Sequence, residues 1–326
     1  MHRCIVLISF IWMLVFPCAG VAELSLGQQA AKERGLMLYN QHKAISAEPY
    51  LKEAAEAGDR EAQYFLGEAL RFNNRHMTEE AYKWYAAAAA QGDYYAMYRL
   101  ARTGSDLCSV MGNCSSDGKT AKEWLVLGRE TAKALAEQGD AEAMYVLYYL
   151  TTKIEWLEKA AEAGRPEAQY DLARYYQKGN GFFFPPWRRS ERACQLLEAS
   201  AQGGYIRSML LYQDCLYERG DNTGIRYWIE KAVEKGDADT VIDYVQLLSH
   251  KPERYEVSLD LVRAYGFLIL LEELDGGGAA ISFVEDFKPK LLEQLTPEQI
   301  EQAKAFAKEW KATHPPLSYF PEKLGF

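Results

Sequence analysis

One short segment recurs along the chain, and it constrains the fold more than any other feature of the sequence. The copy KEAAEAGDREAQYFL returns as EKAAEAGRPEAQYDL, with looser copies between and after them. A glycine holds the same position in each copy: Gly58, Gly92, Gly139, Gly164, Gly204 and Gly236. A repeat of this length is one supersecondary unit, and it buries its apolar face only by stacking on its neighbours.

The residues before the glycine predict a helix. A large side chain eight positions before the glycine shares a helix face with a small one four positions later, which lets a second helix approach closely. The large position holds Tyr50, Trp84, Trp156, Leu196 and Trp228. The glycine ends this helix, because only glycine adopts a left-handed backbone at little cost.

The residues after the glycine predict a second helix. In four copies an aspartate follows directly and can cap the helix N-terminus: Asp59, Asp93, Asp140 and Asp237. In the fourth copy Arg165 takes this place, and Pro166 stands where the first helical turn accepts proline. Further on, small and large residues share one face, and we expect the large ones to pack between repeats: Tyr64, Tyr98, Tyr145 and Tyr170.

Units of this kind, with the pattern AAE-x-G-x-x-EAQY-x-L, resemble Sel1-like repeats, which are relatives of the tetratricopeptide repeat. The resemblance covers residues 44–250. It implies an all-α, right-handed α-solenoid of six stacked helix–turn–helix repeats with capping helices. Residues 23–43 are then the N-terminal capping helix. Residues 251–326 hold a degenerate seventh repeat and a C-terminal capping helix, with Thr296 as N-cap and Pro297 at its first position.

The beginning of the chain predicts export. A positively charged start precedes an apolar run, and small residues end at Ala22, so residues 1–22 are typical of a secretory signal peptide. Lipidation at Cys18 is the alternative. We therefore expect a periplasmic protein with no transmembrane segment in the mature chain. A formal net charge of −9 without a basic cluster argues against a nucleic-acid partner.

Four cysteines lie outside this leader, and an even number in an oxidising compartment indicates disulfides. Three pairings are possible. The sequence favours Cys108 with Cys114 inside one loop, and Cys194 with Cys215 inside one repeat. Zinc binding is the rival interpretation, but the spacing offers no CxxC pair and no neighbouring histidine.

Two insertions interrupt the repeats. Residues 103–119 are predicted to form a surface loop stapled by its cysteines, with a rigid finger that enters a partner's cleft as the alternative. Residues 179–189, GNGFFFPPWRR, combine aromatic and basic side chains. We expect Phe182 or Phe184 to pack on the protein. The candidate contacts with a partner are Phe183, Trp187, Arg188 and Arg189, since Trp and Arg are enriched in binding hot spots.

No known catalytic pattern is present in the sequence. It lacks HExxH, the GxSxG elbow, a P-loop and an EF-hand loop. The glutamates that recur with the repeat are most simply solvated helix faces. We therefore predict no catalytic residue, no metal and no cofactor, and a protein that is not an enzyme.

The overall plan resembles the periplasmic immunity proteins of type VI secretion phospholipase D effectors. The shared features are a signal peptide, six or seven repeats, acidic charge and a final helix that begins LTPEQ. This resemblance implies a secreted phospholipase as protein partner, whose active-site entrance the solenoid occludes. Two alternatives stay open: an envelope scaffold or regulator that assembles other proteins, and a Sel1-like protein that binds or hydrolyses β-lactams. The sequence leaves the binding face and the oligomeric state open.

Overall fold

The computed structural model describes residues 23–115, 118–250, 254–274, 279–321 and 323. The predicted signal peptide, with Cys18 and the cleavage site at Ala22, lies outside the described residues. The described residues form helices and two isolated β-bridges, with no β-sheet among them. The α-helices are α1 (Leu26–Asn40), α2 (Ala44–Glu56), α3 (Arg60–Asn74), α4 (Glu79–Ala90), α5 (Tyr94–Ala101), α6 (Leu107–Met111), α7 (Ala121–Ala136), α8 (Ala141–Thr151), α9 (Ile154–Glu162), α10 (Pro166–Gln177), α11 (Arg188–Gln202), α12 (Ile206–Glu218), α13 (Asn222–Glu234), α14 (Ala238–Ser249), α15 (Leu261–Glu272), α16 (Ala280–Leu292) and α17 (Pro297–Thr313).

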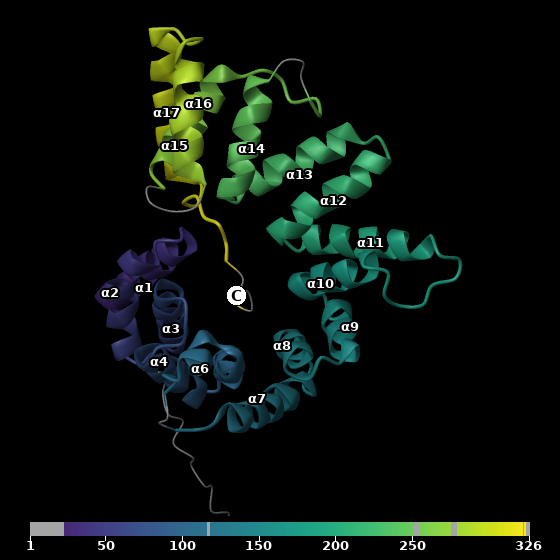
Figure 1. The fold of residues 1–326 in the computed structure, drawn as a ribbon. Helices are drawn as coiled ribbons and strands as arrows, with labels where there is room; N and C mark the ends of the chain where they lie inside the picture. Colours follow the sequence, from purple (N-terminus) through teal and green to yellow (C-terminus); the bar gives the residue numbers. More distant parts are fainter. Residues whose placement is uncertain (1–22, 116–117, 251–253, 275–278, 322, 324–326) are drawn as a thin grey trace, which may run out of the picture.

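Most helices pack on the helices that precede and follow them, while α5 packs on α7 and α15 on α17, so the chain forms an α-solenoid (Figure 1). The repeat glycines lie at the turns of the pairs α2/α3, α4/α5, α7/α8, α9/α10, α11/α12 and α13/α14. This arrangement confirms the predicted fold class, because each pair buries its apolar face only against the next pair.

The turns have the chemistry that the repeat predicts. All six repeat glycines have positive φ, between 81° at Gly236 and 95° at Gly139. The aspartates that follow accept a hydrogen bond from a main-chain N–H of the next helix, as Asp59 does from Ala62 at 2.7 Å. Pro166 begins α10 as expected. Local sequence thus sets where each helix stops and the next begins.

The core extends along the solenoid in two parts. Buried apolar side chains form two clusters that meet at α8, where Met144 and Tyr149 pack against both. Trp84 and Trp228 are buried. Trp156 is only half-buried, because it lies in the first turn of α9, and the Lys159 ammonium sits 4.4 Å from its ring centroid.

The two ends of the solenoid meet. The Lys43 ammonium, just before α2, donates a hydrogen bond of 3.2 Å to the carbonyl of Glu273, just after α15. A cavity of 330 Å³ lies between α1 and the region of α15 and α17. After α17 the chain turns inward and runs toward the middle of the ring of helices (Figure 1). The segment that follows α17 therefore contacts repeats from both halves of the chain.

Candidate protein-binding groove

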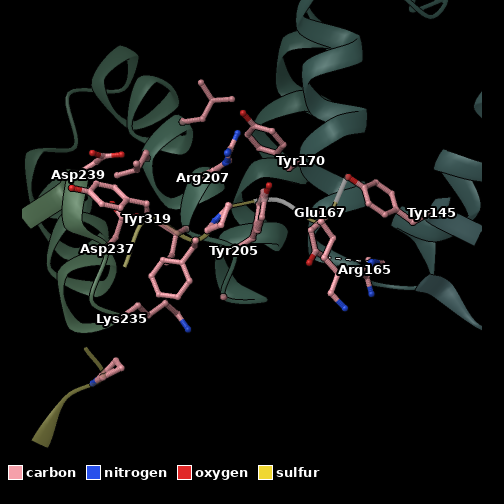
Figure 2. A pocket seen from close by; sticks show the side chains of 18 of the residues that line it. Tyr145, Arg165, Glu167, Tyr170, Tyr205, Arg207, Lys235, Asp237, Asp239 and Tyr319 are labelled. Atoms are coloured by element: carbon pink, nitrogen blue, oxygen red, sulfur yellow. Dashed lines mark ion pairs between the residues drawn. The ribbon is translucent and has the colours of Figure 1, made fainter. Parts of the chain in front are cut away.

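A cavity of 1180 Å³ lies on the inner side of the solenoid (Figure 2). Its walls come from α5, α8, α10, α12, the turn between α13 and α14, and the segment after α17. We call this cavity the inner groove, and the side chains that characterise it are Tyr145, Arg165, Tyr170, Tyr205, Arg207 and Asp239.

Tyrosines form one wall of the inner groove. Tyr145 and Tyr170 hold the same repeat position in α8 and α10, and Tyr205 directly follows a repeat glycine. The rings of Tyr170 and Tyr205 meet edge to face with centroids 5.3 Å apart. We expected the repeat tyrosines in the core, and Tyr64 is indeed only 1% exposed. Tyr145 and Tyr170 also border the groove, since a tyrosine ring packs while its hydroxyl reaches a polar surface.

The Tyr145 hydroxyl on this wall is held by a carboxylate, which a neighbouring tyrosine shares. Tyr145 and Tyr149 both donate to the same Oδ2 atom of Asp171, at 2.8 and 2.7 Å. Burial raises the pKa of Tyr145, and the nearby Asp171 carboxylate raises it further. The phenol therefore stays neutral and keeps its proton to donate.

The Arg165 cation lies beside Tyr145 at one end of the inner groove (Figure 2). The Arg165 guanidinium pairs with Glu142 at 3.3 Å and with Glu167 at 3.4 Å. It also donates to Tyr95 Oη at 3.2 Å and lies 5.5 Å from the Tyr145 ring centroid. These contacts hold the planar group in one orientation while it stays partly exposed, which suits it to bind a carbonyl or carboxylate of another chain.

The far end of the inner groove is acidic. Asp237 caps α14, and Asp239 follows it in the first helical turn. Burial raises the pKa of both carboxyls, and at Asp239 the His42 imidazole opposes that rise. The groove thus presents aromatic, basic and acidic side chains, and complementary charges on a bound segment would fix its register.

A buried ion pair lies behind the groove, on the side of α3 and α5. The Arg99 guanidinium contacts both carboxylate oxygens of Glu68, at 2.5 and 2.9 Å, and the two side chains are 7% and 5% exposed. Tyr85 Oη donates to the same carboxylate at 2.8 Å. Because the pair is bidentate, it holds Arg99 in a fixed position from which it reaches the inner face.

The loop of residues 179–189 is a second candidate surface. Trp187 is 70% exposed, and Arg188 beside it is exposed at the start of α11. Phe183 and Arg189 are engaged within the loop. The Phe183 ring meets Tyr176 edge to face at 4.9 Å, and the Arg189 guanidinium lies 5.9 Å from the Phe183 ring.

The expectation that Phe182 or Phe184 packs on the protein is wrong. Their side chains are 93% and 79% exposed, and Phe183 between them is the one that packs. Neighbouring side chains of an extended segment point to opposite sides, so packing of the middle ring turns the other two outward.

Both favoured disulfides are present, Cys108–Cys114 and Cys194–Cys215. The first closes the loop after α5, which Asp106 ties to the turn before α4 by accepting from the Met77 N–H at 2.8 Å. Three apolar side chains of this stapled loop face solvent: Leu107, Val110 and Met111. Among the residues that the structure describes, neither this loop nor residues 179–189 lines the inner groove.

The groove residues that sequence analysis missed have a common signal. The position after the repeat glycine holds the capping aspartate in four copies, but Arg165 and Tyr205 in the other two. Neither side chain caps its helix. Both instead line the inner groove. The missing aspartate in two adjacent repeats therefore indicated that the residue after the glycine lines the groove there and does not cap the helix.

Within the described part of the chain, no cluster of three or more His, Cys, Asp or Glu side chains is placed to hold a metal ion. No helix there combines the length and apolar character needed to cross a membrane.

The fold and the groove define the class of protein, an all-α repeat solenoid with a groove on its inner side. No protein-family model and no curated protein matches the sequence. Several solved structures are similar, and two of them are repeat proteins of the Sel1 or SLR type. A protective antigen of uropathogenic Escherichia coli with an SLR fold is 19% identical with a TM-score of 0.46, covering 89% of this chain and 62% of that one. A Sel1 repeat protein from Oxalobacter formigenes is 23% identical with a TM-score of 0.39, covering 70% and 93%. This chain thus spans less than two thirds of the first neighbour.

Proposed function

We propose that this chain is a periplasmic protein-binding repeat protein, and that it serves as an immunity protein. Its partner is a phospholipase-type effector delivered by type VI secretion, whose active-site entrance it occludes. The observation that carries the binding role is the pair of Trp187 and Arg188, adjacent and exposed at the start of α11. These residue types dominate binding energy when a partner buries them.

The loop geometry supports occlusion. Phe182 and Phe184 project from the same loop, while Phe183 and Arg189 fix its base. An exposed apolar projection on a fixed base loses little entropy when it enters a cleft, which favours tight binding. The two disulfides support an oxidising compartment. The effector class itself rests on the resemblance of the sequence plan.

The test is affinity capture with residues 23–326 from lysate of the same organism, read by mass spectrometry. We expect a phospholipase-type effector, retained by the unmodified chain and lost by the variant Trp187→Ala/Arg188→Ala. Val126→Ala is the matched control, since it truncates an exposed apolar side chain on α7, away from the loop. Inhibition of the captured phospholipase by the unmodified chain would complete the case.

The other outcomes have a clear meaning. Capture of resident envelope proteins alone would contradict the immunity role and favour the scaffold. Capture of the effector with equal efficiency by Trp187→Ala/Arg188→Ala would keep the immunity role and move the contact away from this loop.

A further inference from the structure

The segment after α17 lies across the inner face like a bound peptide. The His314 ring stacks on Trp310 with centroids 3.6 Å apart, and two prolines then direct the chain into an extended conformation. The segment contacts the turn before α2, the turn before α14 and the side of α3 and α5. Described residues 314–321 and 323 of it are called the tail below.

One side of the tail pairs like a β-strand. The Ser318 N–H donates to the Gly236 carbonyl at 2.8 Å, and the Ala238 N–H donates to the Ser318 carbonyl at 2.9 Å. A Cβ on Gly236 would lie 3.1 Å from the carbonyl oxygen of Pro316, so the glycine also makes room for the tail. Pairing of this kind recognises main chain and does not depend on the side chains of the extended partner.

The other side of the tail contacts the end of α1 and the turn that follows it. Gln41 Nε2 donates to the Leu317 carbonyl at 2.9 Å, and the Tyr319 N–H donates to the Asn40 carbonyl at 2.8 Å. The Tyr319 ring stacks on His42, with centroids 4.5 Å apart. This stack is a contact that depends on an aromatic side chain at that place.

The tail then reaches a built subsite for a basic residue. The Lys323 carbonyl accepts from Tyr64 Oη at 2.6 Å and from Arg99 Nη2 at 3.2 Å. Its ammonium lies 4.9 Å from the Tyr95 ring centroid and 5.8 Å from that of Phe65. Two rings around one ammonium attract a cation. Arg99, 7% exposed, is already held by Glu68.

The tail leaves open space beside it on the inner face of the solenoid. Tyr319, Phe320, Pro321 and Lys323 form one side of the inner groove, and its 1180 Å³ lie between them and the tyrosine wall. Phe320 is 38% exposed. A segment held mainly by main-chain hydrogen bonds, beside open space with further recognition groups, is suited to exchange with another segment of the same type.

We infer that the tail is an internal ligand of the inner face of the solenoid, and that an extended segment of a protein partner displaces it. The contacts assign the chemistry of that segment. It carries an aromatic residue that stacks on His42 and, four residues later, a lysine or arginine that enters the ring pair of Tyr95 and Phe65. The acidic charge of the chain favours such a basic segment. The inference rests on the proposed function only for the identity of the partner.

The test uses the full chain and a fluorescent peptide with the sequence of residues 314–323, HPPLSYFPEK, followed by anisotropy. Internal competition weakens binding in proportion to the occupied fraction. We expect Tyr319→Ala in the chain to tighten peptide binding about tenfold, because its own tail competes less. Lys323→Ala, at the end of the tail, is the second variant. Lys308→Ala, an exposed lysine on α17, is the control and leaves the affinity unchanged.

Equal peptide affinity of the unmodified chain, Tyr319→Ala and Lys323→Ala would overturn the inference, since the tail would then be a permanent part of the fold. Loss of helical circular dichroism in both variants would overturn it in the same way. A peptide with alanine in place of its tyrosine and lysine is expected to bind at least about tenfold more weakly. Peptide exchange without capture of any effector would support this inference and contradict the immunity role. Effector capture that is insensitive to excess peptide would support the immunity role and contradict this inference.

Discussion

The phenolic hydroxyl of Tyr64 donates a hydrogen bond of 2.6 Å to the carbonyl oxygen of Lys323, 259 residues further along the chain. Tyr64 belongs to the first repeat, and Lys323 lies at the far end of the tail. A linear solenoid would place these residues at opposite ends, so this bond is a direct sign that the structure curves back on itself. The predictions below separate the contributions of the repeat turns, the buried charges, the loops and the tail.

The repeat turns are expected to depend on glycine itself. Gly139→Ala places an L residue at φ of 95°, a left-handed conformation that costs about 1–2 kcal/mol for alanine. No atom would lie within 4 Å of the new Cβ, so the cost is one of backbone alone. Gly27→Ala, inside α1 and equally free of contacts, should stabilise by about 0.5–1 kcal/mol. Chemical unfolding followed by circular dichroism checks both signs, and equal effects would contradict the argument.

The buried pair of Glu68 and Arg99 is expected to be strongly coupled. Glu68→Gln leaves the guanidinium buried without its counter-charge and should cost about 3–5 kcal/mol. Adding Arg99→Met should recover much of this loss, because the uncompensated charge is then removed. Glu61→Gln, an exposed acid on the same helix that pairs with Lys32, should cost at most about 1 kcal/mol. A double variant as unstable as Glu68→Gln alone would contradict the coupling.

The loop of residues 179–189 is expected to distinguish its three phenylalanines. Phe183→Ala removes the edge-to-face contact with Tyr176 and the contact with Arg189, and should destabilise by about 1 kcal/mol. Phe182→Ala removes a ring that is 93% exposed and should change stability by less than about 0.5 kcal/mol. Thermal unfolding of the two variants is the measurement. The reverse order would show that another ring anchors the loop.

The two disulfides are expected to contribute differently to the free energy of unfolding. The Cys194–Cys215 bridge joins α11 to α12 across 21 residues, whereas Cys108–Cys114 spans 6. By loop-closure entropy the longer bridge should contribute about 3 kcal/mol and the shorter about 2 kcal/mol. Urea unfolding of the paired alanine variants tests the order. A larger loss from Cys108→Ala/Cys114→Ala would indicate that the stapled loop supports the fold beyond its own closure.

The contact between the tail and His42, on which the Tyr319 ring stacks, is expected to weaken in acid. Burial lowers the pKa of His42, while the Asp239 carboxylate opposes that shift. The unfolded chain therefore takes up a proton on this imidazole at a higher pH than the folded chain, and folding loses stability as the pH falls through the unfolded value of about 6.5. His42→Asn keeps the left-handed backbone, φ 59°, that asparagine tolerates.

The measurement is the free energy of unfolding of both proteins between about pH 7.5 and 5.5, which brackets the histidine range. We expect the unmodified chain to lose stability relative to His42→Asn as the pH falls. A difference that does not change with pH would contradict the assignment. Both chains keep Asp243, whose raised pKa contributes to both curves, whereas the Asp239 carboxyl loses the opposing effect of the His42 imidazole in the variant.

The sequence by itself determined where the helices of each repeat begin and end and which cysteines pair. Gly58 and its equivalents, the aspartate caps, Pro166 and the cysteine pairs act through contacts within one repeat or one loop, so their roles follow from neighbouring residues. These features were enough to predict an all-α solenoid and both disulfides. They were also enough to single out residues 179–189 as an unusual surface.

Only the tertiary structure decided how the repeats combine. The curvature of a solenoid is the sum of small rotations between neighbours, and no single repeat encodes it. That sum brings Lys323 to Tyr64 and places Ser318 beside Gly236. It also gathers Arg165 and Tyr205 into one groove, although each looks in the sequence like a missing cap. The tertiary structure also decided which of the three adjacent phenylalanines packs. Phe183 packs because it meets Tyr176, and the sequence pattern did not place Tyr176 against this loop.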